Sequence, residues 1–418
     1  MKKILFAALC LGLIASTADA KHYIITVENN TRAPVNWDAF VTRAGGEVVE
    51  TYDFIDGALL DLPEERAQQL MDRRAPGMTI EEDFVINWIK GDSSALKALN
   101  GYSGAKTGVS SAVPSAAPAV PSKKTVKVKN QAEPLMNTTV PSNGELPWGI
   151  VRVNAAGMWN ITEGAGVKIA VIDTGINFNH EDLKDNYVDG VNYTGIKGIA
   201  GLGSPMDDQG HGTHVAGTIA AARNGIGVAG VAPKAKLYAV KVMNAKGQGS
   251  MSAIIRGLGW AVKNKMNIVN MSLGGGPYVE AMHKAVKNAV ENGVTVICAA
   301  GNDAGPVNYP AKYPETIAVS ASGPDDAIAP FSSRGEEIDV MAPGMWINST
   351  SVTGKYEELH GTSMACPHVS GLAALAYAAG YRTPAEIRAV LKKAAEPVKG
   401  LSQEEQGAGI PNAQKLRK

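Results

Sequence analysis

The strongest constraint on the fold is an alternation of short apolar strands with helical stretches, which begins at Leu146. Residues 167–172 form a nearly continuous apolar run, as expected for a strand buried on both faces of a parallel sheet. Similar runs lie at 237–242, 268–271, 295–299 and 316–320, and helical patterns lie at 211–222, 252–264, 279–292 and 363–379. This alternation predicts an α/β fold with a doubly wound, mainly parallel sheet and helices on both faces.

The first twenty residues have the pattern of a signal peptide. Lys2 and Lys3 precede an apolar run over 4–15, and Ala18-Asp19-Ala20 supplies a small-x-small cleavage site. The run is shorter than the roughly 20 residues that a membrane-spanning helix needs. We therefore expect residues 1–20 to be removed, the protein to be secreted (extracellular or periplasmic), and no membrane segment to remain. A buried N-terminal helix is the alternative interpretation.

Three further regions follow the signal peptide. Residues 21–90 predict a small ferredoxin-like α+β domain, because their strands and helices occur in the order βαββαβ. Residues 91–143 are rich in Pro, Ala, Ser and Lys, which is typical of a linker, although the lysines of 123–129 leave a binding patch open as an alternative. Residues 144–418 form the α/β domain.

Charge and cysteine content exclude several classes of protein. The chain has 40 Lys and Arg residues and 40 Asp and Glu residues. It therefore lacks the excess of basic residues that non-specific electrostatic binding to nucleic acid or an anionic membrane requires. Three cysteines are present, and Cys10 would leave with the signal peptide. The remaining Cys298 and Cys366 form no disulfide framework or metal cluster. A bridge between them stays open, but we expect two partly buried thiols.

Three chemically complementary side chains occur at the ends of predicted elements. Asp173 ends a strand, and His211 and Ser363 each begin a helix. Ligands of open α/β sheets bind beyond the carboxyl ends of the strands, where such residues meet. A serine hydroxyl needs an imidazole to take its proton, and a carboxylate orients that imidazole. Asn302, after another strand, can supply an amide donor to a developing oxyanion.

Together these motifs resemble the subtilisin-like serine proteases. The resemblance rests on Val171-Ile172-Asp173-Thr174-Gly175, His211-Gly212-Thr213-His214-Val215-Ala216-Gly217, Asn270-Met271-Ser272-Leu273-Gly274-Gly275, Ala300-Gly301-Asn302 and Gly361-Thr362-Ser363-Met364-Ala365. It extends from about Leu146 to Gln414 and follows the Asp–His–Ser order of that family. The resemblance implies a serine endopeptidase that acts on proteins or peptides through an acyl-enzyme.

The resemblance also implies a role for each site residue. Asp173 would be the orienting acid, His211 the general base and acid, Ser363 the nucleophile and Asn302 the oxyanion donor. Ser272, Leu273 and Gly274 would pair with an extended substrate. Ala299, Ala300 and Gly301 would line the pocket for the side chain before the scissile bond, and these small residues leave room for an apolar side chain. Asn308 would lie at the floor of this pocket and make it more polar.

The region 21–90 gains a role from the same resemblance. It resembles the family's pro-peptide, an intramolecular chaperone and inhibitor, and residues 81–85 resemble the stretch that precedes the cut. The chain would be a self-processed zymogen and a monomer once mature. The linker departs from the family's pattern, so the mature N-terminus is left open between 88 and 145.

A structural Ca²⁺ is a further implication of the resemblance. The matching ligands are the side chains of Asp182 and Asn224 and the carbonyls of Ala222, Ile226 and Val228, which are the hard oxygen donors that calcium prefers. Gly144 stands where the family has a glutamine ligand, and Glu145 is a candidate replacement.

Three other interpretations are weaker. The G-x-G-x-x-G pattern over 225–230 lies before a strand, whereas a dinucleotide site needs it after one. His211 and His214 could suggest a metal-dependent hydrolase, but no H-E-x-x-H motif accompanies them. A secreted binding protein on an inactive protease scaffold would have lost a catalytic side chain, and all four are present.

Overall fold

The computed structural model describes residues 20–28, 35–73, 76–89, 145–195 and 203–418. The chain divides into two units: residues up to Phe84 with Val279–Lys284, and the segments Val85–Tyr278 and Ala285–Lys418. The signal peptide expected at 1–20, save Ala20, and the linker expected at 91–143 lie outside the described residues. Within these ranges, no helix combines the length and apolarity needed to cross a bilayer.

The first unit is a four-stranded antiparallel sheet with two helices, in the predicted order βαββαβ. Its strands lie in the order β2-β3-β1-β4. One helix connects β1 to β2, and the other connects β3 to β4. Alternate residues of β1, Tyr23 and Ile25, are buried with Leu60 in one apolar cluster. The elements are β1 (Ala20–Val27), α1 (Trp37–Ala44), β2 (Glu47–Tyr52), a 3-10 turn (Asp53–Ile55), β3 (Gly57–Pro63), α2 (Glu64–Asp72) and β4 (Met78–Glu82).

The second unit is built on a seven-stranded parallel sheet, which confirms the predicted fold class. The strand order is β13-β12-β11-β10-β6-β8-β7, so β6 lies inside the sheet between β10 and β8. The strands are β6 (Lys168–Asp173), β7 (Tyr187–Asn192), β8 (Lys236–Lys241), β10 (Ile268–Met271), β11 (Thr295–Ala299), β12 (Ile317–Ser322) and β13 (Ile338–Pro343).

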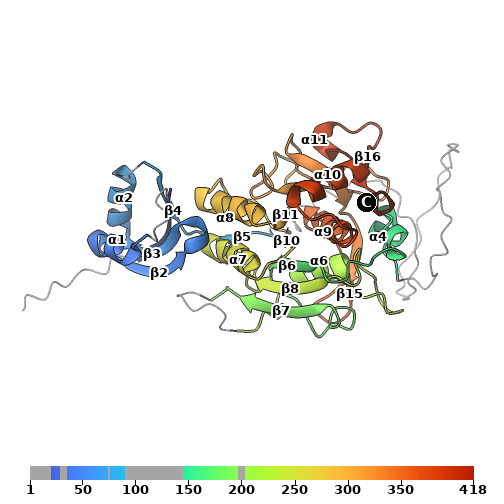
Figure 1. Cartoon of the computed structure of the whole chain (residues 1–418), viewed down its shortest axis with the longest axis horizontal. Coiled ribbons are helices and arrows are strands. Elements are labelled where there is room, and N and C mark those ends of the chain that lie inside the picture. Colours follow the sequence, from blue (N-terminus) through green and yellow to red (C-terminus); the bar gives the residue numbers. More distant parts are fainter. Residues whose placement is uncertain (1–19, 29–34, 74–75, 90–144, 196–202) are drawn as a thin grey trace, which may run out of the picture. The chain divides into compact units, whose positions relative to one another are not determined.

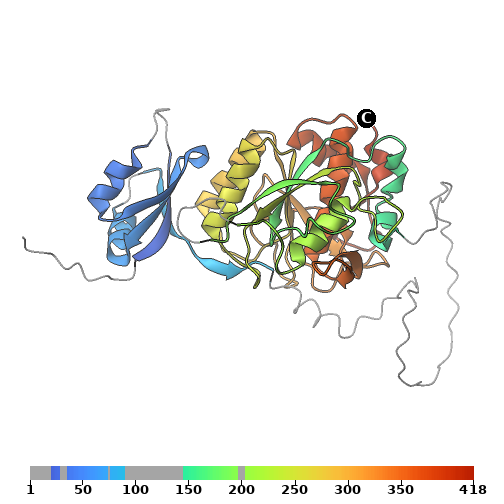
Figure 2. The ribbon, with the colours of Figure 1, turned by 90° about the horizontal axis from the view of Figure 1, so that it is seen from below.

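Helices cover both faces of this sheet. Figures 1 and 2 show α7 and α8 on one face and α6, α9 and α10 on the other. These helices are α6 (His211–Ala220), α7 (Met251–Lys263), α8 (Glu280–Glu291), α9 (Thr362–Ala378) and α10 (Pro384–Ala394). Shorter elements complete the unit: β5 (Val85–Asn87), α4 (Trp148–Arg152), α5 (Ala156–Trp159), β9 (Gln248–Ser250), β14 (Ile347–Thr350), β15 (Tyr356–Leu359), β16 (Ala395–Glu396), α11 (Gln403–Gln406), β17 (Ile410–Pro411) and a 3-10 turn (Ala413–Leu416).

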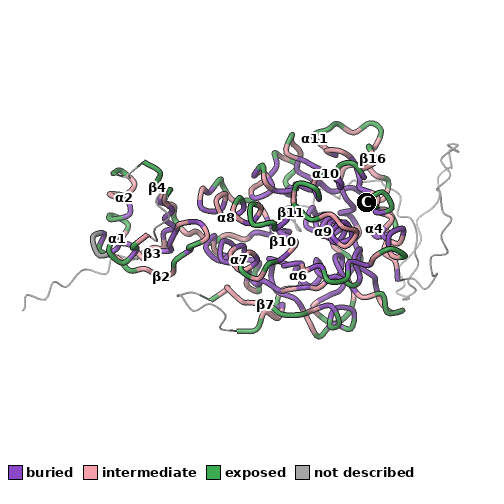
Figure 3. The backbone as a smooth tube through the Cα atoms, in the orientation of Figure 1, coloured by how far each residue is buried: buried purple, intermediate pink, exposed green. Residues whose placement is uncertain are grey.

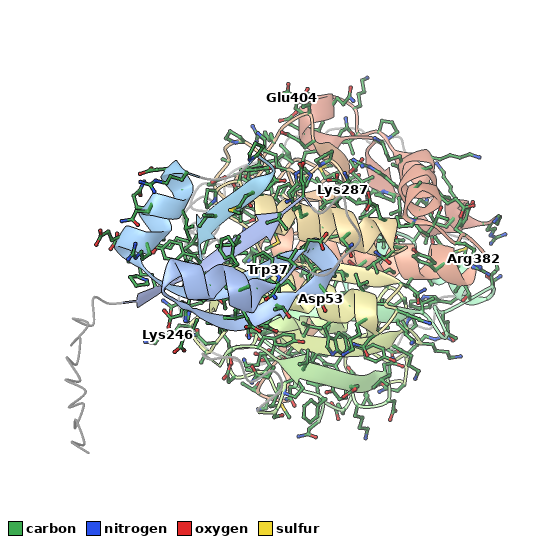
Figure 4. All side chains as sticks on the ribbon, turned by 60° about the vertical axis from the view of Figure 1, so that its left-hand side comes forward. Trp37, Asp53, Lys246, Lys287, Arg382 and Glu404 are labelled. Carbon is green, nitrogen blue, oxygen red and sulfur yellow. The ribbon has the colours of Figure 1, made fainter. Side chains whose placement is uncertain are left out.

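Helix α9 forms the centre of the core. Every residue from Thr362 to Tyr377 is buried, and the purple tube in Figure 3 follows this helix through the molecule. Its many Ala and Gly residues let neighbouring elements approach closely; a Cβ on Gly371 would clash with the Val231 side chain. Arg382 and Glu404, which Figure 4 labels, are exposed charged residues.

Among the seven strands of the large sheet and the five longer helices of the second unit, the sequence pattern missed three elements. Strand β7 has exposed and half-buried residues, so it lacks the apolar run that marks a central strand. Strand β13 is fully buried but includes Asp339 and ends in Pro343, which obscures the pattern. Helix α10 begins with a capping box at Thr383 and Glu386, a local signal that was present in the sequence.

Candidate active site

The carboxyl edge of the sheet holds a buried carboxylate. Asp173 is the last residue of β6 and is fully buried. The N–H of Thr174 donates a hydrogen bond to its Oδ1 at 2.7 Å. A buried carboxylate needs such donors, because an unpaired charge in the interior is costly.

An imidazole supplies the second donor to this carboxylate. His211 is the first residue of α6, after Gly210 with φ 119°, a backbone conformation that favours glycine. The distance from His211 Nδ1 to Asp173 Oδ1 is 2.8 Å, and the two side chains are 1% and 0% exposed. Because a carboxylate only accepts, Nδ1 carries the proton, and Nε2 is the basic nitrogen whenever the ring is neutral.

The serine hydroxyl lies at the start of α9. Ser363 Oγ donates to the carbonyl oxygen of Ser272 at 3.2 Å, and Ser272 Oγ donates to the carbonyl oxygen of Ser363 at 2.8 Å. This reciprocal pair ties the first turn of α9 to the segment that follows β10. The hydroxyl and the expected substrate-binding segment are therefore fixed to each other.

The amide of Asn302 has a defined orientation. Its Oδ1 accepts hydrogen bonds from both the N–H and the hydroxyl of Thr362, each at 2.8 Å. With the oxygen held in this way, the amide nitrogen is turned to the opposite side, and Asn302 and Ser363 line the same cavity. Sequence reasoning missed Thr362, whose only signal was its place before Ser363 in the motif.

That cavity has a volume of about 270 Å³. Five of the seven expected substrate-binding residues line it: Leu273, Gly274, Ala299, Gly301 and Asn308. The other two, Ser272 and Ala300, are fully buried beside it. A Cβ on Gly301, which has φ 118°, would clash with the Asn308 amide, so that amide lies directly against the pocket wall.

An extended segment of the chain lies along the same cleft. Strand β5 pairs antiparallel with β9, and the next residue, Trp88, continues the pairing. Its N–H donates to Gly247 O, and its carbonyl accepts from Gly274 N, both at 3.1 Å. The indole is 3% exposed and donates to Gly249 O at 2.8 Å. Residues 86–89 therefore form one wall of the cavity that holds Ser363.

Two of the expected calcium ligands, the side chains of Asp182 and Asn224, are joined by a hydrogen bond. The buried Asp182 carboxylate accepts from Asn224 Nδ2 at 3.0 Å, Val228 N at 3.1 Å and Tyr356 OH at 2.8 Å. Glu145 reaches the same loop, where its Oε1 accepts from the N–H groups of Asn224 and Gly225. The oxygens are of the kind that calcium takes. A cation would need the Asn224 amide to turn, so that its oxygen replaces its nitrogen.

In the described part of the chain, no group of three or more His, Cys, Asp or Glu side chains is arranged to hold a metal. His214 Nε2 lies 2.9 Å from the carbonyl oxygen of Ile347, and burial lowers the pKa of this histidine to about 3. His214 is therefore a neutral structural residue, which argues against a site shared with His211.

Both cysteines are free thiols and are fully buried rather than partly buried. The Cys366 thiol donates to Asn270 Oδ1 at 3.3 Å, and burial raises its pKa to about 12. Burial also raises the pKa of Cys298 well above its ordinary value. Both sulfurs are therefore protonated near neutral pH.

The fold and the side chains at its carboxyl edge define a doubly wound α/β protein with a buried aspartate–histidine pair and a serine that lines a cleft. The family model described as the Subtilase family matches residues 164–409. The chain belongs to this family.

Individual relatives agree with the family match. The chain is 48% identical over 232 residues to Subtilisin Savinase of Lederbergia lenta. This aligned region covers 55% of this chain and 83% of that protein. It is also 48% identical to M-protease of Shouchella clausii (strain KSM-K16) over 55% of this chain and 59% of that protein. Subtilisin E of Bacillus subtilis (strain 168) is 48% identical over 55% of this chain and 60% of that protein. The matched region thus spans about three fifths of two of these relatives.

Thr362→Val should lower kcat by about tenfold and leave KM within about twofold, because the Asn302 amide loses its hydroxyl anchor. Thr362→Ser keeps the hydroxyl and is the matched control. Steady-state hydrolysis of a chromogenic peptide measures both constants. A Thr362→Val enzyme with unchanged kcat would show that the backbone N–H alone orients the amide.

The thiols should not react with iodoacetamide in the folded protein at pH 8, because they are buried and protonated. Mass spectrometry of the native protein should find no adduct, and the unfolded protein should carry one on each cysteine. Rapid modification of Cys366 in the native state would contradict its burial.

Proposed function

We propose that the chain is a secreted serine endopeptidase that hydrolyses peptide bonds through an acyl-enzyme and matures from a self-processed zymogen. The observation that carries the proposal is the buried pair of His211 Nδ1 and Asp173 Oδ1, 2.8 Å apart, on the sheet edge where Ser363 and Asn302 line a cleft. Membership of the Subtilase family supports it.

In the proposed mechanism, the Ser363 hydroxyl turns from the Ser272 carbonyl and gives its proton to His211 Nε2 as its oxygen attacks the substrate carbonyl. Asp173 stabilises the imidazolium. Asn302 Nδ2 and the Ser363 N–H, at the start of α9, donate to the oxyanion. His211 then returns the proton to the leaving amine. A water molecule, activated by the same imidazole, hydrolyses the acyl-enzyme.

The cleft suits an extended peptide substrate. Gly274 N and the carbonyl oxygen of Gly247 bond to the backbone of Trp88, and a substrate strand would use the same groups. The small residues Ala299 and Gly301 leave room for an apolar side chain before the scissile bond, and the Asn308 amide narrows the pocket. We propose a broad specificity with an apolar preference.

Residues 21–90 are proposed to be the pro-peptide and inhibitor of the same molecule. The position of Val85 to Ile89 along the cleft supports this role and favours a first cut near the end of this region. The extracellular or periplasmic location, the linker role of 91–143 and a monomeric mature domain within 144–418 belong to the same proposal.

Mature protein from wild-type chain should begin at Lys90 or beyond, whereas Ser363→Ala should remain intact from residue 21, because it lacks the nucleophile. Intact mass and N-terminal sequencing measure both. A serine-directed sulfonyl fluoride should add once to the wild type and not to Ser363→Ala, and Ser370→Ala, on the same helix, is the control that still labels.

Two outcomes would count against the proposal. Identical cutting of Ser363→Ala without added protease would exclude self-processing. Folded, processed wild-type protein that takes no label would favour a binding protein on an inactive scaffold.

We also propose one structural Ca²⁺ held by Asp182, Asn224 and the carbonyls of Ala222, Ile226 and Val228. Calcium should raise the melting temperature of the Ser363→Ala protein by several degrees, because a ligand that binds only the folded state stabilises it. Asp182→Asn should abolish this increase. If calcium and a chelator give equal melting temperatures, the hydrogen bonds from Tyr356 and Asn224 already satisfy the carboxylate.

A further inference from the structure

A buried ammonium group lies beside the acid–imidazole pair. Lys241 is the last residue of β8, is 2% exposed and is the direct neighbour of Asp173 in the parallel ladder. Its Nζ donates to Thr174 O at 2.5 Å, Asp208 Oδ1 at 2.6 Å and Met243 O at 3.0 Å. A lysine ammonium has three hydrogens, so this group is fully used.

Each acceptor belongs to a segment that reaches the site. Thr174 follows Asp173, donates its N–H to the Asp173 carboxylate, and accepts from Gly212 N through its hydroxyl. Met243 N donates to the Asp173 carbonyl, so the turn after β8 closes back on β6. One ammonium group thus joins the residue that follows Asp173 to the turn after β8.

The third acceptor lies in the loop that precedes the histidine. Asp208 is three residues before His211, and its side chain is 54% exposed whereas that of Lys241 is 3% exposed. Its neighbour Asp207 binds the same loop to the first turn of α6, through Gly210 N at 2.9 Å and Thr213 Oγ1 at 2.6 Å. The loop is therefore fixed on one side to its own helix and on the other to β8.

The charges around His211 come from several elements. Asp173 on β6 is in direct contact, and Lys241 on β8 is the cation joined to both segments. The other titratable groups facing this region are Asp207 and Asp208 in the preceding loop, Glu357 on β15 near Gly210, neutral His214 on α6, protonated Cys366 on α9 and Asp303 in the cleft. Lys241 is the cation that the described contacts bring to the acid–base pair.

We propose that Lys241 and Asp208 form a positioning ion pair. The pair holds Asp173 of β6 and His211 of α6 in their relative positions, and its opposite charges compensate each other beside these two residues. Lys241 fixes the position of the Asp173 carboxylate through its hydrogen bond to Thr174, and Asp208 compensates the positive charge of Lys241. The proposal rests on the proposed protease function, because it assigns the ion pair a role in that same reaction.

The two members have opposite electrostatic effects on His211. Removal of Asp208 leaves a buried positive charge uncompensated, which disfavours the imidazolium. Removal of Lys241 leaves a negative charge, which favours it. A single charge near a titrating group in a protein typically moves its titration by about half a pH unit. A purely structural role would not produce shifts of opposite sign.

The test compares Asp208→Asn, Lys241→Met and the double variant in the full chain after self-processing. The midpoint of the acid limb of kcat/KM should fall by about half a pH unit in Asp208→Asn, rise by a similar amount in Lys241→Met, and return toward wild type in the double variant. Lys241→Met should also lose about tenfold in kcat with KM within about twofold, because Thr174 is no longer held. Glu396→Gln, which breaks the ion pair with Lys415, is the control and should leave the midpoint unchanged.

Labelling with the sulfonyl fluoride counts the active molecules of each variant, which separates the two proposals. If the wild type takes no label, the protease function itself fails. If the wild type labels and the variants keep its midpoint, or shift in the same direction, the ion pair has no such role. Asp208 is half exposed, so Asp208→Asn decides the question if Lys241→Met does not fold.

Discussion

The hydrogen bond between the Asp173 carboxylate and the His211 ring is the interaction on which the rest of the structure depends. Both groups are buried, and a carboxylate so placed is tolerated only with donors around it. The inner position of β6 fixes the carboxylate, and the N-terminus of α6 fixes the ring. The surrounding contacts of Thr174 and the loop before His211 maintain this geometry.

The sequence was sufficient for the fold class and for five of the seven strands of the large sheet. Buried parallel strands are recognisable because most of their residues are apolar, as in β6 and β11. The helices between them are recognisable by their length. Asp173, His211, Ser363 and Asn302 were singled out as candidates because each lies at or just beyond the end of such an element. Strand β7 was missed because an exposed edge strand has no comparable pattern.

The parts that could not be predicted are contacts between residues distant in the sequence. The bond from Thr362 to Asn302 joins residues 60 apart, and the bond from Lys241 to Asp208 joins residues 33 apart. Each side chain is ordinary by itself, and no local pattern indicates its partner. The burial of Cys298 was underestimated for a related reason, because its depth depends on the helix packed over the strand.

The position of Trp88 has a consequence for observing this molecule in solution. Its indole is enclosed in the cleft and hydrogen-bonded to Gly249 O, so departure of this segment would transfer the ring to water. Indole emission is sensitive to the polarity around the ring. The chain has six tryptophans, so a Trp88→Phe difference spectrum would isolate the contribution of this one. The fluorescence of Trp88 would therefore show whether this segment occupies the cleft or has left it.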